Sequence, residues 1–417
     1  MCSNQSISFS SSPLVIVRGE GSYLYDEDGT EYLDCVNNVA HVGHCHPKVT
    51  AAVCRQLGRV NTNTRYLHPA RAAYVERLLA TFPPELDVAF LVCSGTEAND
   101  LALRLASGNP GGGAGAGDVL VLDGAYHGHS GALVDLSPYK HAWQGGGVAP
   151  AHVHTVRVPD LYRAPAGTAA RDFAGDVPAA VARLRRATGR RPVALFAEAV
   201  LGCCGQVPLP AGYLRAAYAA VRAAGGLCVA DEVQTGFGRC GAHFWAFEAQ
   251  GVVPDVVTFG KPAGNGVALA GVVCRRAVAE RFRATGVEYF STFGGSTAAC
   301  AAGLAVLDAI RDDRLQENAR ATGKYLMRRL QYLCAKYECV GHVRGMGLFV
   351  GVEIVKDKRS KEPDGELAAK LSTKMKEDYQ VLISLDGKHN SAIKIKPPMT
   401  FDKSCVDRLC FCLDMCL

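Results

Sequence analysis

Short apolar runs rich in β-branched residues alternate with helical stretches through the middle of this 417-residue chain. Six of these runs are predicted to be buried strands: residues 88–92, 119–122, 193–196, 227–230, 256–259 and 271–274. Between them, segments such as 211–224 have the apolar spacing of a helix. A strand-then-helix order repeated in this way is typical of a parallel sheet covered by helices on both faces. The alternation therefore predicts an α/β fold with a large, doubly wound, mainly parallel sheet.

The two ends of the chain predict a smaller α+β domain. Near the start, residues 23–25 and 31–34 flank Asp28-Gly29, a dipeptide typical of a hairpin turn. After Thr297 we expect one long helical stretch to residue 337, then a strand at 348–355, a helix at 366–379 and strands near 381–384 and 392–395. The expected boundaries are 1–60 for the N-terminal part of the small domain, 61–296 for the large domain and 297–417 for the C-terminal part.

Composition excludes several classes of protein. Hydrophobic residues make up 48% of the chain and charged residues 20%, which suits a soluble globular protein. Lys plus Arg number 45 and Asp plus Glu 40, without a basic block, so nucleic acid is not an expected partner. No stretch approaches the roughly 20 apolar residues of a membrane span, and residues 1–17 do not resemble a secretory signal. The 17 cysteines therefore indicate reduced thiols in a soluble intracellular protein, of the mitochondrial matrix or the cytoplasm.

Two segments imitate site motifs. The glycine-rich stretch 111–117 has no Lys, Ser or Thr and leads into a strand, so we interpret it as a surface connector rather than a phosphate loop. His41, His44, Cys45 and His46 are crowded into six residues, which makes tetrahedral wrapping of a metal awkward. We predict no metal site.

Four short motifs at strand ends carry the chemistry. Gly95 and Thr96 follow the strand at 88–92 and open a helix, where backbone N–H groups favour an anion such as phosphate. Asp231 ends an apolar strand, Lys261 ends another, and Tyr126 follows a third. Each motif has a structural explanation by itself, such as a helix cap or a solvent-facing lysine. Together they supply a phosphate cup, an acid for a pyridine nitrogen, an aldehyde-binding amine and a stacking ring, which are the requirements of pyridoxal phosphate.

On these residues the chain resembles the class III aminotransferases of pyridoxal-phosphate-dependent fold type I, and within them the phospho-lyase branch. The resemblance runs from about residue 14 to 415 and includes four long strings: NNVAHVGHCHP at 37–47, NTNTRYLH at 61–68, ADEVQTGFGR at 230–239 and IKIKPPM at 393–399.

The resemblance implies a role for each motif residue. Gly95 and Thr96 would bind the cofactor phosphate, and Tyr126 and Val233 would pack on the two ring faces. Asp231 would hold the pyridine nitrogen protonated, and Gln234 would lie near the ring hydroxyl. Lys261 would bind the cofactor covalently and later move the substrate proton. Thr292 would reach the phosphate in a neighbouring subunit, which implies a homodimer or a dimer-based tetramer.

The residues that would bind the substrate are less clear from the sequence than those that would bind the cofactor. Many transaminases of the family have an arginine before the double proline, where it binds a substrate carboxylate. Here Lys394 holds that position and Lys396 follows, and a lysine point charge suits phosphate as well. Arg65, Asn37 and Asn38 are further candidates for holding a substrate phosphate.

These features predict a phospho-lyase that eliminates phosphate from a phosphorylated amine, most simply ethanolamine phosphate, with 5-phosphohydroxy-L-lysine as the other candidate. Two alternatives stay open. One is a class III transaminase of the alanine-glyoxylate or omega-amino acid type. The other is an inactive protein that binds cofactor or a partner. Members of the family usually extend further at both ends, which would leave the small domain of this chain incomplete.

Overall fold

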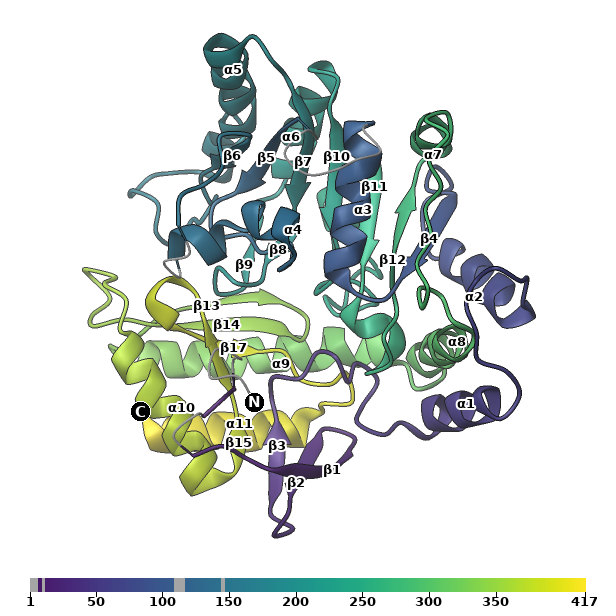
Figure 1. Ribbon diagram of the computed structural model, residues 1–417. Coiled ribbons are helices and arrows are strands. Elements are labelled where there is room, and N and C mark those ends of the chain that lie inside the picture. Colours follow the sequence, from purple (N-terminus) through teal and green to yellow (C-terminus); the bar gives the residue numbers. More distant parts are fainter. Residues whose placement is uncertain (1–6, 10–11, 109–116, 144–146) are drawn as a thin grey trace.

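The computed structural model describes residues 7–9, 12–108, 117–143 and 147–417. Of the predicted connector at 111–117, only Gly117 lies within the described residues. The larger part of the molecule is built on a seven-stranded sheet, and the smaller part lies below it in Figure 1.

The predicted strands form one sheet in the order β4-β12-β11-β10-β7-β5-β6. Their bounds are β4 Val88–Val92, β5 Asp118–Leu122, β6 Val153–Val156, β7 Pro192–Ala197, β10 Leu227–Asp231, β11 Val256–Phe259 and β12 Ala270–Cys274. All six predicted runs are confirmed, and β6 was missed. β12 pairs antiparallel with both β11 and β4, whereas the other pairs are parallel. The link from β11 to β12 is too short for a crossover helix, which explains the reversal.

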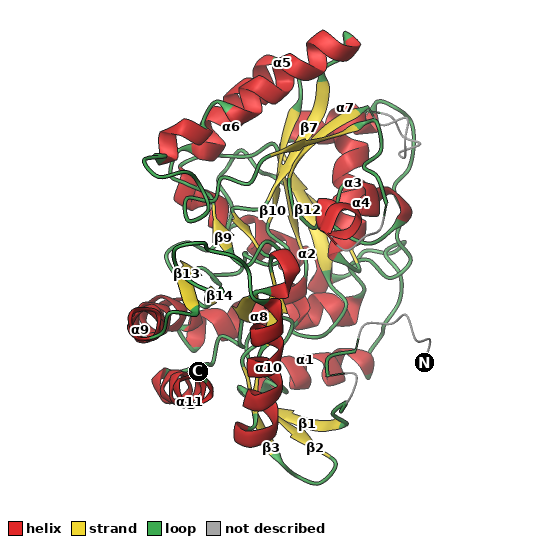
Figure 2. Ribbon diagram, turned by 90° about the vertical axis from the view of Figure 1, so that its left-hand side faces the viewer, coloured by secondary structure: helices red, strands yellow, loops and turns green. Residues whose placement is uncertain are grey.

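Helices cover both faces of this sheet, as the doubly wound prediction requires. Val119 and Val121 of β5 pack in one core cluster with α3 (Gly95–Ser107), and Leu120 and Leu122 pack in another with α6 (Tyr213–Ala223). Figure 2 shows the strands between α5 and α6 on one side and α3 and α7 on the other. The other helices and strands between residues 47 and 283 are α1 Pro47–Leu57, α2 Pro69–Leu79, α4 Gly131–Asp135, α5 Asp176–Thr188, α7 Arg276–Arg283, β8 Val200–Leu201 and β9 Val207–Pro208.

The smaller part contains an antiparallel sheet in the order β13-β14-β17-β16, flanked by helices. Its elements are α9 Leu315–Lys336, β13 Val340–Met346, β14 Phe349–Ile354, α10 Gly365–Tyr379, β16 Ser384–Asp386, β17 Ala392–Ile395 and α11 Lys403–Cys416. The single helix expected from Thr297 to residue 337 is wrong. Arg314 adopts a φ of 53°, which ends α8 (Thr297–Asp312) before α9 begins. β13 was not predicted.

Both ends of the chain share a second small sheet, β1-β2-β3-β15. β2 (Tyr23–Asp26) and β3 (Glu31–Asp34) form the predicted hairpin, with Gly29 at a φ of +83° in its turn. β1 (Ile16–Glu20) pairs with β2, and β15 (Val381–Leu382) pairs in parallel with β3. The boundaries at residues 60 and 296 remain a prediction. No helix within the described residues has the length and apolar character to cross a membrane.

A buried arginine joins segments that are far apart in the sequence. Arg239 is 0% exposed and donates hydrogen bonds to the carbonyl oxygens of Leu348 and Pro397. Its Nη2 lies 3.2 Å from Nδ1 of His41, whose Nε2 meets the Phe237 carbonyl oxygen at 2.8 Å. Burial, and then the charge of Arg239, lowers the pKa of His41 well below its ordinary value, so its neutral ring can accept from the guanidinium.

We expect Arg239→Met to lower the free energy of unfolding by about 2–4 kcal/mol, because two buried carbonyl groups and an imidazole lose their donor. The matched control is Arg283→Met, whose side chain is 82% exposed and paired with Glu280, and this change should stay within about 0.5 kcal/mol. Urea unfolding measures both. Equal midpoints for the two variants would contradict the stabilising role of Arg239.

Candidate active site

The predicted cofactor residues meet in one cavity of about 320 Å³ at the carboxyl ends of the parallel strands. Seven of the eight line it: Gly95, Thr96, Tyr126, Asp231, Val233, Gln234 and Lys261. The eighth, Thr292, is exposed and does not line the cavity.

The first turn of α3 forms one wall. Ser94 caps the helix by accepting from the Glu97 backbone N–H at 3.2 Å, and Glu97 accepts from the Cys93 N–H at 3.0 Å. A Cβ on Gly95 would stand 2.7 Å from a Val233 methyl carbon, so only glycine lets α3 approach the end of β10 this closely. The helix therefore turns its positive end toward the cavity beside the Thr96 hydroxyl group.

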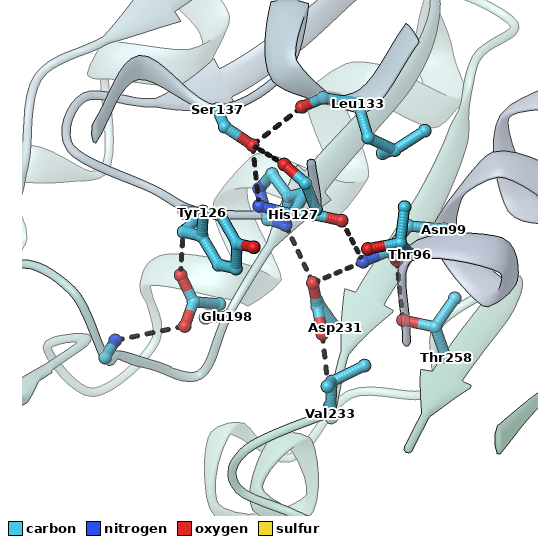
Figure 3. Close-up of polar contacts among 12 residues, drawn as sticks. Thr96, Asn99, Tyr126, His127, Leu133, Ser137, Glu198, Asp231, Val233 and Thr258 are labelled. Atoms are coloured by element: carbon cyan, nitrogen blue, oxygen red, sulfur yellow. Dashed lines mark hydrogen bonds and ion pairs between the residues drawn. The ribbon is translucent and has the colours of Figure 1, made fainter. Parts of the chain in front are cut away.

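Asp231 is 4% exposed and accepts three hydrogen bonds (Figure 3). Asn99 Nδ2 donates at 2.7 Å, His127 Nδ1 lies at 2.8 Å, and the Val233 N–H donates at 3.0 Å. Burial opposes the charge of Asp231, but the hydrogen bond and charge of His127, with the two other donors, outweigh burial and lower its pKa. The cavity therefore has an anionic side chain in its wall.

A second set of contacts orients those donors, and the sequence analysis missed it. Thr258 donates to Asn99 Oδ1 at 2.7 Å, so the Asn99 amide nitrogen faces Asp231 and the His127 carbonyl oxygen. The Ser137 hydroxyl accepts from the His127 backbone N–H at 3.0 Å. His127 follows Tyr126 directly and Asn99 lies one helical turn beyond Gly95, which are the signals that point to them.

Glu198 is a further residue of the cavity wall that the sequence analysis missed. It follows β7 directly, as Asp231 ends β10, so the same strand-end rule indicates it. Glu198 is 2% exposed and accepts from the Gly202 N–H at 3.0 Å and the Tyr126 N–H at 3.5 Å. Burial, and then the charge of Asp231, raises the pKa of Glu198 to about 7.

Lys261 begins a short turn, Lys261–Gly264, after β11. A Cβ on the preceding Gly260 would lie 3.3 Å from the Gly95 backbone, so the end of β11 and the start of α3 nearly touch. Lys261 Nζ has no hydrogen-bond or ion-pair partner among the described residues. Its amine is therefore available to the cavity that it lines.

The predicted substrate residues lie outside the lining of this cavity. Lys396 Nζ donates to Gln234 Oε1 at 2.6 Å, and Lys394 forms an ion pair with Asp386 at 3.0 Å. Asn37 and Asn38 line a neighbouring cavity of about 440 Å³, next to Val39, which does line the main one. The Arg65 guanidinium lies 4.4 Å from the centre of the Phe290 ring.

These residues fit pyridoxal phosphate on chemical grounds. A helix that begins with glycine offers its first backbone N–H groups to the phosphate. A buried ionised carboxylate suits a protonated pyridine nitrogen. An unpartnered lysine suits an aldehyde, and the Tyr126 ring suits stacking.

Comparison with known proteins decides the family. The model of the class III aminotransferases matches residues 6–417. The chain belongs to this family. Pyridoxal phosphate is accordingly its cofactor, and the mixed α/β architecture is that of fold type I.

Relatives within the class III family carry two kinds of name. An "Alanine--glyoxylate aminotransferase 2-like" protein of Drosophila melanogaster is 44% identical, covering 98% of this chain and 83% of the relative. An "Ethanolamine-phosphate phospho-lyase homolog 1" of Caenorhabditis elegans is 37% identical, covering 99% and 90%.

Solved structures divide in the same way. A phospholyase from Arthrobacter in complex with phosphoethanolamine has a TM-score of 0.90 and 37% identity, covering 99% of this chain and 96% of that one. A PLP-bound amine transaminase from an uncultivated Pseudomonas species has a TM-score of 0.89 and 28% identity, covering 100% and 97%.

We expect Glu198→Gln to stabilise the cofactor-free protein above pH 7. The unfolded chain ionises Glu198 near its ordinary pKa of 4.5, while the folded chain holds the proton until about pH 7. Wild-type stability from this group is therefore full below pH 4.5 and is lost as the pH rises to 7. The amide has no proton to lose, so the variant's advantage should grow between pH 5 and 7.5 to about 1–3 kcal/mol.

Urea unfolding at pH 5, 6, 7 and 8 measures this difference. Glu27→Gln, on the exposed hairpin turn, controls for the loss of a carboxylate elsewhere. A stability difference between Glu198→Gln and wild type that does not change with pH would contradict the raised pKa.

Proposed function

We propose that this protein is a pyridoxal-phosphate-dependent phospho-lyase that releases inorganic phosphate from a phosphorylated amine, with ethanolamine phosphate as the first candidate. The likeness to the Arthrobacter phospholyase with phosphoethanolamine, over nearly the full length of both chains, carries the proposal. The substrate candidate 5-phosphohydroxy-L-lysine shares the amino-phosphate core.

The Lys394 ion pair supports a lyase over a transaminase. Lys394 stands where many transaminases of the family place a carboxylate-binding arginine, and here its charge is engaged by Asp386 at 3.0 Å. A lysine also lacks the planar fork that holds a carboxylate by two hydrogen bonds. This favours a substrate without an α-carboxylate, such as ethanolamine phosphate.

In this proposal the residues that line the cavity have separate roles. Gly95 and Thr96 hold the cofactor phosphate, Tyr126 and Val233 hold its ring, and Asp231 keeps the ring nitrogen protonated. Bound pyridoxal phosphate supplies an electron sink for the substrate carbon next to nitrogen. Lys261 Nζ would take the proton from that carbon.

The overall reaction balances with one water. Loss of the proton to Lys261 leaves an electron pair that expels phosphate from the neighbouring carbon, and water then releases the amine nitrogen. Ethanolamine phosphate and water give acetaldehyde, ammonia and inorganic phosphate. No keto-acid acceptor takes part.

We also infer that the active form is a two-fold dimer. Thr292 and the neighbouring Phe293 are exposed, the latter to 73%, and Tyr66 and Leu67 are exposed to 77% and 99%. The contact between Arg65 and Phe290 joins these two segments into one partly apolar surface. Such a surface suits a second subunit, which would bring its own Thr292 to the cofactor phosphate.

A class III transaminase is the second candidate, because the Drosophila melanogaster relative with 44% identity carries an aminotransferase name. Incubation of the cofactor-loaded protein with each phosphoamine, and separately with alanine plus glyoxylate, distinguishes the two. The proposal predicts equal amounts of phosphate and aldehyde without an acceptor. Pyruvate that appears only with glyoxylate, without phosphate release from either phosphoamine, would establish the transaminase instead.

Arg65→Ala tests the expectation from the sequence that Arg65, which does not line the cavity within one subunit, holds the substrate phosphate. Loss of one charge-assisted hydrogen bond should raise KM for the phosphoamine by about 10-fold or more, with a smaller effect on kcat. The control is Arg59→Ala, an exposed arginine near the end of α1, which should leave both constants unchanged. If Arg65→Ala also leaves them unchanged, the role belongs to another residue.

A further inference from the structure

Lys396 is a buried amino group beside the cavity, and its position differs from that expected of a substrate ligand. It follows β17 directly, and its backbone N–H donates to the Cys35 carbonyl oxygen at 2.8 Å. The residue is 3% exposed, and its Nζ donates to Gln234 Oε1 at 2.6 Å. Lys396 does not line the cavity, whereas Gln234 does.

The surroundings of Lys396 do not leave its amino group free for an incoming phosphate. Nζ lies 4.9 Å from the centre of the Phe349 ring, which stabilises a cation on that side. Burial, and then the charge of Lys394, lowers the pKa of Lys396 to about 7. The amino group carries N–H donors in either protonation state, so the hydrogen bond to Gln234 does not depend on a full charge.

The Gln234 amide is confined on its other side as well. A Cβ on Gly202 would stand 2.5 Å from Gln234 Nε2 and 3.3 Å from Glu198 Oε2. The amide nitrogen therefore lies against Gly202, on the side where Glu198 Oε2 also lies, while the amide oxygen faces Lys396. With its oxygen occupied, Gln234 can offer the cavity only N–H donors.

We propose that Lys396 is a positioning residue that fixes the Gln234 amide with its N–H donors toward an acceptor oxygen of the bound cofactor, and that it does not contact the substrate. Lys396→Met leaves Gln234 Oε1 without its donor and frees the amide to rotate. The inference rests on the assignment of this cavity to the cofactor, and it does not depend on the lyase reaction.

The test is a double-mutant cycle on the dissociation constant of pyridoxal phosphate, measured by titration of the cofactor-free protein without substrate. We expect Lys396→Met to weaken cofactor binding by about 10-fold in the wild-type background and by less than about 2-fold in a Gln234→Ala background. Lys376→Met is the matched control: Lys376 is 4% exposed, donates to the Ser12 carbonyl oxygen at 2.7 Å and lies on α10. This variant should bind the cofactor as wild type does.

Two results would overturn the proposal. One is an equal loss of cofactor affinity in both backgrounds, which would mean that Lys396 acts without Gln234. The other is unchanged cofactor affinity of Lys396→Met in the wild-type background, which would mean that Lys396 does not position Gln234 for the cofactor. If thermal melting shows that the Lys396→Met variant is not folded, Lys396→Gln is used in its place. This variant keeps an N–H donor, so it should lose less than about 3-fold in affinity, and a 10-fold loss would count against the proposal.

Because substrate is absent from the cycle, its outcome is separable from the proposed reaction. A protein that binds pyridoxal phosphate with the expected coupling but releases no phosphate would keep this inference and lose the lyase assignment. Phosphate release without coupling between Lys396 and Gln234 would support the lyase assignment and contradict this inference.

Discussion

The Asp231 carboxylate is the constraint around which the active-site region is built. It ends β10 in a place that is 4% exposed, and it stays ionised because Asn99, His127 and Val233 all meet it. A buried charge without such partners would be costly. The three contacts also join α3, the loop after β5 and the end of β10 at one carboxylate, so this charge organises one wall of the cavity.

The pKa values of two buried acids in the cavity wall, Asp231 and Glu198, are shifted in opposite directions. Asp231 accepts from an imidazole and an amide besides a backbone N–H, and its pKa is lowered. Among the described residues, Glu198 accepts hydrogen bonds only from backbone N–H groups. Burial, and then the charge of Asp231, raises its pKa to about 7. Environment sets two roles for two carboxylates, as is common in enzyme sites. Below about pH 7, Glu198 is therefore mostly protonated while Asp231 keeps its negative charge.

Strand-end reasoning predicted much of this arrangement from the sequence. The six apolar runs follow from the alternation of apolar and helical stretches, and Gly95 follows from its place at the start of a helix. Asp231 and Lys261 were indicated by their places at the ends of apolar strands. The direction of β12 and the break at Arg314 did not follow, because a strand's direction depends on its link and a single φ of 53° leaves no periodic signal.

Residues that orient other side chains were not predicted, because their partners lie far away in the sequence. Asn99 and Thr258 matter through one shared hydrogen bond, and this pairing joins positions 159 residues apart in sequence. Lys396 was predicted as a substrate ligand on its charge, and its hydrogen bond to the Gln234 amide was not predicted. Charge and spacing indicate which side chains have chemical capacity, but only the packed structure gives their partners.

The central claim is that this cavity binds pyridoxal phosphate through Lys261. The most direct measurement is borohydride reduction of the cofactor-loaded protein, followed by peptide mass spectrometry to locate the bound pyridoxyl group. We expect a single label on Lys261, which is absent from the Lys261→Ala variant. A label on another lysine, or none on a protein supplied with excess cofactor, would contradict it.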